Sequence, residues 1–222
     1  MSESKKKPEL GDAAAVPKAV ISRLSLYLRE LQHLVRSGME TTNSSELGRL
    51  LGFTDAQVRK DLAYFGQFGH PGIGYRCDEL IAAIRSILGT NLTWPVAIVG
   101  VGNLGRALLG YKGFNRQGFR LVAAFDIDSS KVGSTIDGVP VYHLDDLHTI
   151  VQEKKVRLGV ITVPAAAAQA VAETLVAAGV EGVVNFAPVT ITLPPHVSLV
   201  GVDLAIELEQ ITFAVVNRRA SE

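Results

Sequence analysis

A glycine-rich turn supplies the first residues whose types and spacing suggest a chemical role. Residues 96–105 read VAIVGVGNLG, so an apolar run leads into GxGxxG spacing at Gly100, Gly102 and Gly105. In a dinucleotide-binding turn the first glycine makes the bend, the second lets the backbone approach a pyrophosphate, and the third lets the helix pack on the sheet. The N-terminus of that helix also offers N–H groups to phosphates. Glycines that serve packing alone are the alternative. The expected cofactor-binding turn comprises Gly100, Val101, Gly102, Asn103, Leu104 and Gly105.

An acidic residue at the end of the next apolar run indicates which dinucleotide would bind. Asp126 ends the expected strand LVAAFD, 21 residues after Gly105. A carboxylate in this place accepts hydrogen bonds from the ribose hydroxyls of an adenosine and repels a 2′-phosphate. We therefore expect NAD(H) rather than NADP(H) as the cofactor. Asp128 is a competing candidate, but Asp126 lies at the strand end and is preferred.

Residues at the ends of the later expected strands should line the same crevice, because ligands of open α/β sheets bind outside the carboxyl ends of the strands. Thr162 and Asn185 can hydrogen-bond an amide or a ribose, whereas Val163 and Phe186 offer apolar walls. Ordinary strand termination is the alternative for each of them. The candidates are Thr162, Val163, Pro164, Asn185, Phe186 and Asp203.

A second group of candidates lies in the segment DAQVRKDLAYF, expected to be a helix over residues 55–65. At 100° per residue Val58, Leu62 and Phe65 share one face, which predicts contact with a core. Arginine and lysine can bind guanine edges or phosphates, and glutamine can read adenine. A solvated helix face is the alternative. The arc opposite the core face carries Ala56, Gln57, Arg59, Lys60, Ala63 and Tyr64.

The elements around this segment are those of a winged helix-turn-helix. An apolar stripe predicts a first helix, and a short second helix, capped by Asn43 or Ser44 with Glu46, ends at Gly52 before a three-residue turn. Residues 66–76, GQFGHPGIGYR, predict a hairpin-like wing, with a purely structural loop as the alternative. The stripe consists of Ile21, Leu24, Leu28, Leu31 and Val35. The expected DNA-binding residues are Ser44, Ser45, Gln57, Arg59, Lys60, Tyr64 and His70.

From Trp94 onward, apolar strands alternate with helices, which predicts a parallel sheet covered on both faces. The fold class is therefore α/β, with an N-terminal winged helix-turn-helix domain and a C-terminal Rossmann-type domain. The expected strands are 96–100, 121–126, 139–142, 158–163, 182–187 and 198–203. The expected divisions are a disordered tail at 1–16, a winged-helix domain at 17–77, a linker helix and connection at 78–93, a Rossmann domain at 94–203 and a C-terminal helix at 204–222.

Composition narrows the classes of protein that remain. The 222 residues have no formal net charge, and residues 18–76 carry eight Lys and Arg against five Asp and Glu, 8 − 5 = +3. This mild excess predicts that phosphate binding needs two copies of the DNA-binding domain. Cys77 is the only cysteine, and no run of 18 apolar residues or signal peptide is visible. We expect a cytoplasmic location, no membrane partner and no metal site.

The quoted segments, taken in order, resemble the Rex family of bacterial redox-sensing repressors over roughly residues 17–217. The resemblance rests on ISRLSLYLREL, VRKDLAYFGQFGHPGIGY, VGVGNLG, YKGF, FDID, GVPVYHLDDL, TVPA, NFAP and VDL. It implies a homodimer in which the C-terminal helix of one chain packs between the domains of the other. It also implies binding to a palindromic operator when the NADH/NAD⁺ ratio is low, and release by NADH.

The same resemblance assigns roles to matching positions. Asp126 would hold the adenosine ribose, and Tyr111 and Asp203 would line the nicotinamide side. Arg29 would pair with Asp203 in one of the two states, which makes Arg29, Tyr111 and Asp203 the expected switch. Position 204 is leucine here, whereas some relatives carry phenylalanine, so a nicotinamide contact there is not carried over.

Two other classes of protein share parts of this pattern. A nicotinamide-dependent dehydrogenase would need a substrate domain and a general acid or base, and the sequence leaves room for neither. A CoA- or nucleotide-binding subunit would leave the winged helix unexplained. The final segment, DLAIELEQITFAVVNRR, predicts a helix that is apolar on all sides and inserts into a partner chain, with packing on its own sheet as the alternative.

Overall fold

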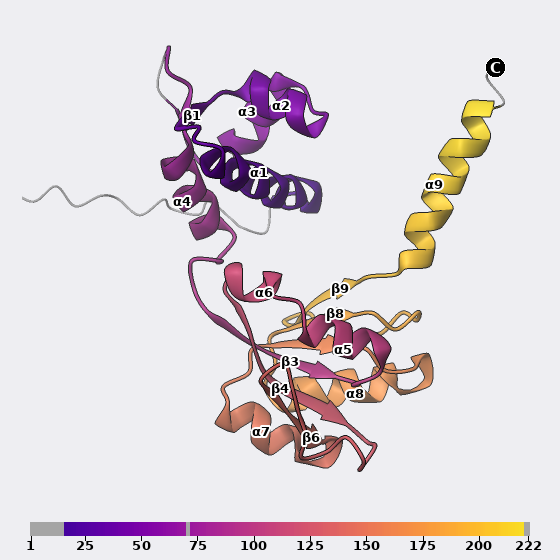
Figure 1. Ribbon diagram of the computed structural model, residues 1–222. Coiled ribbons are helices and arrows are strands. Elements are labelled where there is room, and N and C mark those ends of the chain that lie inside the picture. The colour runs from indigo at the N-terminus through magenta and orange to yellow at the C-terminus, as the bar shows by residue number, and fades with distance from the viewer. Residues whose placement is uncertain (1–15, 70–71, 220–222) are drawn as a thin grey trace, which may run out of the picture. The chain divides into compact units, whose positions relative to one another are not determined.

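The computed structural model describes residues 16–69 and 72–219 (Figure 1). The chain divides into two compact units, Met1–Leu92 and Thr93–Glu222, and each is described by itself. The expected tail lies outside the described residues except for Val16. None of the described helices is long and apolar enough to cross a membrane.

The described part of the N-terminal unit, residues 16–69 and 72–92, is built from four helices around one apolar core. They are α1 (Lys18–Arg36), α2 (Ser44–Leu51), α3 (Asp55–Ala63) and α4 (Cys77–Ile87). The α1 stripe is confirmed at Leu24, Leu28 and Leu31, whereas Ile21 and Val35 are 37% and 44% exposed. The core side chains shared by the four helices include Leu24, Tyr27, Leu31, Leu47, Val58, Leu62, Leu80 and Ile84.

The end of the wing pairs with a segment outside the loop, which the sequence did not predict. The strand β2 (Tyr75–Arg76) pairs antiparallel with β1 (Thr41–Thr42), which precedes α2. In the described part of the loop, residues 66–69 and 72–76, β2 is the only strand. His70 lies outside the described residues. Pairing between segments on either side of α2 and α3 is not visible in a local pattern, which is why the sequence did not predict it.

The C-terminal unit contains a seven-stranded sheet in the order β5-β6-β4-β3-β7-β8-β9. Six strands run parallel, which confirms the expected Rossmann arrangement, and the order reverses at β3. The short β5 was not expected and pairs antiparallel with β6 at the sheet edge. The strands are β3 (Trp94–Val99), β4 (Phe119–Asp126), β5 (Thr135–Ile136), β6 (Val139–His143), β7 (Leu158–Ile161), β8 (Gly182–Asn185) and β9 (Ser198–Gly201).

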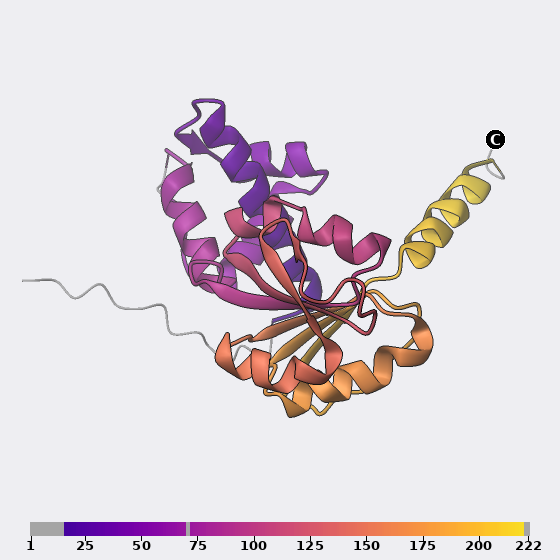
Figure 2. The same ribbon diagram turned by 60° about the horizontal axis from the view of Figure 1, so that its bottom comes forward.

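Helices cover the sheet from two sides. Figure 2 shows α7 (Leu147–Glu153) and α8 (Ala165–Ala177) on one face, and α5 (Asn103–Leu109) on the other. Leu147, Leu175 and Phe125 belong to the core under α7 and α8, while Leu109 and Ile98 belong to the core on the α5 side. The short α6 (Gly113–Arg116) precedes β4, and α9 (Leu204–Arg219) follows β9. The carboxyl ends of β3, β4 and β7 therefore meet beside the glycine-rich turn.

Candidate cofactor and DNA sites

The three glycines of the turn differ in what the fold requires of them. Gly100 has φ +98°, a left-handed conformation that side chains disfavour, and a Cβ on Gly105 would lie 2.0 Å from the Gly100 carbonyl oxygen. A Cβ on Gly102 would meet nothing within 4 Å. Packing therefore explains Gly100 and Gly105 but not Gly102. This open space beside Gly102 is consistent with a turn that leaves room for a pyrophosphate.

Asp126 lies directly against this turn. Its Oδ2 accepts hydrogen bonds from the Val101 N–H (2.8 Å) and the Lys131 ammonium (3.0 Å), and its Oδ1 accepts one from the Asp128 N–H (2.9 Å). Burial raises the pKa of Asp126, but the two backbone N–H groups and Lys131 outweigh burial and hold that pKa below its usual range. The carboxylate is therefore ionised. Asp128 is exposed and bonds Ser130, so the geometry favours Asp126 over Asp128.

Two strand-end residues that were expected to offer hydrogen bonds are already engaged within the chain. The Thr162 hydroxyl donates to the Gly100 carbonyl (2.7 Å), which ties β7 to the turn. Asn185 is 3% exposed, its amide donates to the carbonyls of Ala187 and Val189, and its Oδ1 accepts from the Ala187 N–H. The expectation that Asn185 presents a free amide is wrong. It instead shapes the loop after β8.

The apolar strand-end candidates are Val163, Pro164 and Phe186, and their contact with a cofactor stays a prediction. The Val163 side chain lies 3.0 Å from where a Gly100 Cβ would stand, and Phe186 packs in the core on the α5 side. Pro164 is the residue before α8. These three side chains are consistent with an apolar wall beside the turn.

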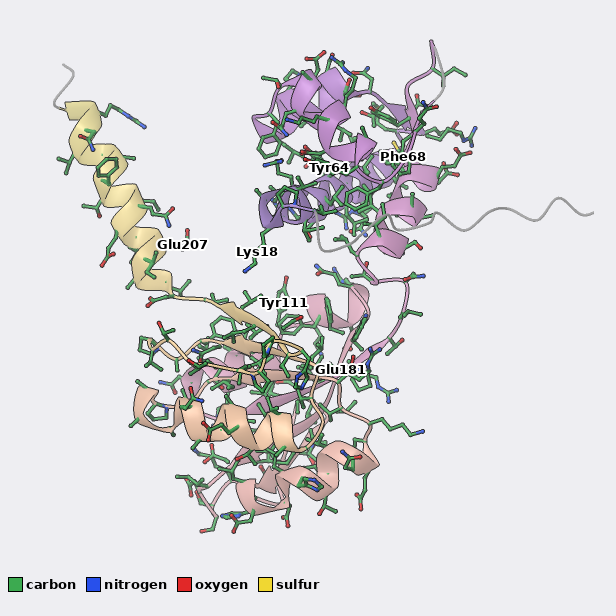
Figure 3. The ribbon with its side chains drawn as sticks, turned by 180° about the vertical axis from the view of Figure 1, so that it is seen from behind. Lys18, Tyr64, Phe68, Tyr111, Glu181 and Glu207 are labelled. Carbon is green, nitrogen blue, oxygen red and sulfur yellow. The ribbon has the colours of Figure 1, made fainter. Side chains whose placement is uncertain are left out.

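A cavity of about 480 Å³ lies beyond the ends of β8 and β9, and its lining includes Asn185, Asp203 and Glu207. Asp203 accepts a hydrogen bond from the Ala205 N–H (2.9 Å) and so caps α9. Figure 3 shows Glu207 at the start of α9. One expected switch residue thus lies in a cavity of the C-terminal unit.

The other two switch residues lie on exposed surfaces. Tyr111 is 55% exposed and contacts Phe114 edge-to-face, with ring centres 5.0 Å apart (Figure 3). Arg29 is exposed on α1 in the N-terminal unit. A pairing of Arg29 with Asp203 would join the two units and stays a prediction.

The helix-turn-helix is confirmed in its details. Asn43 Oδ1 caps α2 by accepting from the Glu46 N–H (2.9 Å), and Thr54 caps α3 through the Gln57 N–H (3.1 Å). Gly48 lets the turn approach α2, because a Cβ there would lie 2.5 Å from the Phe53 carbonyl oxygen. The three residues between α2 and α3 therefore fix how α3 is presented.

The expected DNA-binding residues divide into exposed and engaged groups. Ser45, Lys60 and Tyr64 are exposed, the last to 46%. Arg59 is also exposed, although its Nη1 donates to Asp55 (2.7 Å) and to the Ser44 hydroxyl (3.1 Å). Ser44 is only 9% exposed, and its expected contact with DNA stays a prediction.

Asp61 entered the sequence analysis only as one of the five acidic residues of residues 18–76. It is 0% exposed and accepts from Arg23 Nε (2.5 Å), Arg23 Nη2 (2.8 Å), the Tyr27 hydroxyl (2.7 Å) and Gln57 Nε2 (2.7 Å). Burial raises the pKa of Asp61, but these donors outweigh burial and hold it below its usual range. A signal was available, because positions 58, 61, 62 and 65 form one helical stripe and only position 61 is charged.

Comparison with known proteins agrees with both halves of this description. The family described as "Putative DNA-binding protein N-terminus" matches residues 15–63, and that described as "CoA binding domain" matches residues 91–189. A redox-sensing transcriptional repressor Rex of Carboxydothermus hydrogenoformans is 48% identical over 200 residues, covering 90% of this chain and 96% of that protein. The Rex of Desulfitobacterium hafniense is 46% identical over 205 residues, with coverages of 92% and 98%.

Solved structures show the same similarity along the chain. RSP, a Rex-family repressor, in complex with β-NAD⁺ and operator DNA has a TM-score of 0.87 and 34% identity, covering 92% of this chain and 94% of that chain. RSP with β-NADH has a TM-score of 0.84 and 32% identity, with coverages of 93% and 97%. The relatives are named as repressors, which supports the prediction that the chain is not an enzyme. The chain belongs to the Rex family of redox-sensing transcriptional repressors.

Proposed function

We propose that this protein represses transcription by binding operator DNA when the NADH/NAD⁺ ratio is low, and that NADH releases it. The observation that carries the proposal is the similarity to RSP over 92% of the chain, because RSP has been solved with NAD⁺ and operator DNA. The helix-turn-helix and the glycine-rich turn supply the two matching surfaces. The cofactor then acts as a signal and is not turned over.

The proposed cofactor is NAD(H), held along the carboxyl edge of the sheet. Gly102, Asn103 and Leu104 would face the pyrophosphate, with Val101 behind them. Asp126 would bind the adenosine ribose, and its ionised carboxylate would disfavour a 2′-phosphate. Val163, Pro164 and Phe186 would supply apolar contacts toward the nicotinamide.

The proposed switch consists of Arg29, Tyr111 and Asp203. A ligand shifts a two-state equilibrium only by the difference in its affinity for the two states. NAD⁺ and NADH differ by one charge at the nicotinamide, and Asp203 would sense that difference in the cavity beyond β9. We infer that NADH favours a closed state in which Arg29 holds Asp203. The paired recognition helices would then no longer match successive major grooves.

We further propose a homodimer on a palindromic operator. One supporting surface is α9, whose apolar side chains are 45–73% exposed in the single chain. Another is an apolar hollow of about 260 Å³ on the sheet, lined in part by Val96, Phe119, Val160, Val184 and Val200. Apolar surfaces of this kind favour burial against a partner. The exposed apolar residues of α9 are Leu204, Ile206, Leu208, Ile211, Phe213, Val215 and Val216.

The DNA-facing surface would comprise Ser45, Gln57, Arg59, Lys60 and Tyr64, with His70 as a further candidate in the wing. A cytoplasmic location follows from this function. Lys60→Ala should lower the salt dependence of DNA affinity if Lys60 contacts a phosphate, since each phosphate contact adds roughly 0.9 to the slope.

Fluorescence anisotropy of labelled operator DNA tests the proposal directly. NADH added to the complex should release the DNA, whereas NADPH should require a far higher concentration and CoA should have no effect. Release by CoA alone would favour the nucleotide-binding alternative. Oxidation of NADH in the presence of small carbonyl compounds would revive the dehydrogenase alternative.

A further inference from the structure

We propose that Asp61, which is buried and touches no DNA, is a positioning residue for base readout. It holds the Gln57 amide so that the carbonyl oxygen faces outward, and the repressor thereby favours a base with an exocyclic amine at that contact. This inference rests on the proposed binding of operator DNA.

The orientation of the Gln57 amide follows from the chemistry of its neighbour. Gln57 Nε2 lies 2.7 Å from Asp61 Oδ1. An ionised carboxylate only accepts hydrogen bonds, so the atom of the amide that faces it must be the nitrogen. Gln57 Oε1 is therefore directed away from Asp61.

Gln57 Oε1 is also available to a ligand. Among the described residues, none donates a hydrogen bond to this oxygen, and it is not among the buried polar atoms without a partner. It therefore reaches solvent. Gln57 stands between Ala56 and the core residue Val58, one turn before the fully buried Asp61.

The carboxylate that holds the amide cannot readily turn. A carboxylate has about four lone-pair sites, and each Asp61 oxygen accepts two hydrogen bonds. Arg23 bonds both oxygens in a bidentate pair, which fixes the carboxylate plane relative to α1. Tyr27, also on α1, holds Oδ2. The orientation of Gln57 on α3 is thus set by two side chains of a different helix.

A fixed carbonyl oxygen selects among bases. In the major groove adenine presents the N6 amine and cytosine the N4 amine, whereas guanine O6 and thymine O4 are acceptors that a carbonyl oxygen repels. A free glutamine could rotate its amide by half a turn, so that the nitrogen takes the outward position of the oxygen and donates to those acceptors. Because Asp61 prevents this rotation, the structure assigns part of the sequence specificity to a residue that lies behind the DNA-facing surface.

The test measures affinity for operators in which each half-site position carries each of the four base pairs in turn. With the unaltered chain, one position should favour a base with an exocyclic amine by about tenfold. Gln57→Met should remove that preference and leave the other positions unchanged. Asp61→Asn should reduce the preference at the same position by at least threefold, because its amide can also donate to Gln57 and let it turn.

Several outcomes separate this role from a structural one. If Asp61 only supports the fold, Asp61→Asn will lower affinity for all operators equally, and the preference ratio will not move. The double variant Gln57→Met/Asp61→Asn should show no further loss of preference beyond Gln57→Met. Lys60→Ala is the matched control, since it should weaken binding to every operator alike.

A second measurement does not depend on the Asp61 variant folding. In the full-length protein labelled with ¹⁵N-glutamine, the Gln57 side-chain amide, assigned by its absence in Gln57→Met, should exchange with solvent at least tenfold more slowly than exposed glutamine amides. Fast exchange would overturn the proposal. So would DNA binding in which Gln57→Met changes no base preference, and that result would leave the proposed function intact. Failure of the unaltered chain to bind any operator would overturn both.

Discussion

Asp61 in the N-terminal unit and Asp126 in the C-terminal unit are both buried carboxylates held ionised by neighbouring donors. They differ in whether a lone-pair site remains free for another donor. Asp61 accepts four hydrogen bonds, all from side chains of its own unit. Asp126 accepts three, two of them from backbone N–H groups, so about one of its four lone-pair sites remains. A saturated carboxylate fixes its neighbours, whereas one with spare capacity next to an open glycine turn can receive a ligand.

Removal of the saturated carboxylate should have the largest effect on stability. Asp61→Ala leaves Arg23 and Tyr27 without their buried acceptor, and breaking a buried ion pair in this way costs about 3–5 kcal/mol. Urea unfolding followed by circular dichroism should show this loss. Asp55→Ala is the matched control, because its pair with Arg59 is exposed and exposed ion pairs contribute little to stability. Equal losses of unfolding free energy in the two variants would show that Asp61 is not held in a saturated hydrogen-bond network.

Removal of the unsaturated carboxylate should act on the ligand instead. Asp126→Ala should weaken NADH binding roughly 10- to 100-fold, since a hydrogen bond to a charged group contributes about 1.5–3 kcal/mol. Operator affinity in the absence of NADH should stay unchanged. Anisotropy titrations measure both quantities. An unaltered NADH midpoint would remove Asp126 from the cofactor site.

The two carboxylates share one expected response to acid. Both have pKa values below the usual value of about 3.9, so the unfolded chain binds more protons than the folded chain as the pH falls through that value. Their contribution to stability is therefore complete above about pH 5 and declines as the pH falls toward the lowered pKa values. Trp94, the only tryptophan, lies in β3 under the Arg157 guanidinium, so its fluorescence reports on the C-terminal unit.

The Asp61→Asn variant separates the contribution of Asp61 to acid stability from that of Asp126. Asp61→Asn should make the acid-induced loss of helical circular dichroism shallower, while the pH dependence of Trp94 fluorescence stays the same. An equal change in both signals would mean that Asp61 does not act within the N-terminal unit alone.

The sequence predicted the place of Asp126 but not the burial of Asp61, because the two depend on different kinds of contact. Asp126 follows from local spacing, because a strand end and a glycine turn on adjacent parallel strands must meet. The six parallel strands and the helix-turn-helix were predictable for the same reason. Two of the three partners of Asp61, Arg23 and Tyr27, lie 38 and 34 residues away on α1, and their contact depends on how two helices are rotated against each other. Asn185 differs in its cause, because its partners Ala187 and Val189 follow it closely in the chain and depend on the path of the loop after β8, which the sequence pattern did not specify.

Lys131, the cationic neighbour of Asp126, should have the smallest effect on cofactor binding. Its ammonium lies 3.0 Å from Asp126 and 3.6 Å from Asp128, and its pKa is raised, first by the hydrogen bond to Asp126. It partly offsets the charge that repels a 2′-phosphate. Lys131→Met should therefore widen the preference for NADH over NADPH, by about three- to fivefold for a partly exposed pair. Lys131→Arg keeps the charge and should leave the preference unchanged.

Competition between NADH and NADPH for release of operator DNA measures that ratio. If Lys131 were a ribose ligand and not a counter-charge, Lys131→Met would weaken both cofactors alike and leave the ratio fixed. If the ratio narrowed, Asp126 would not be the group that rejects the 2′-phosphate, because removal of its cationic neighbour can only strengthen a repulsion that originates there. Whether Lys131→Met widens or narrows the preference for NADH over NADPH thus decides whether Asp126 selects the cofactor.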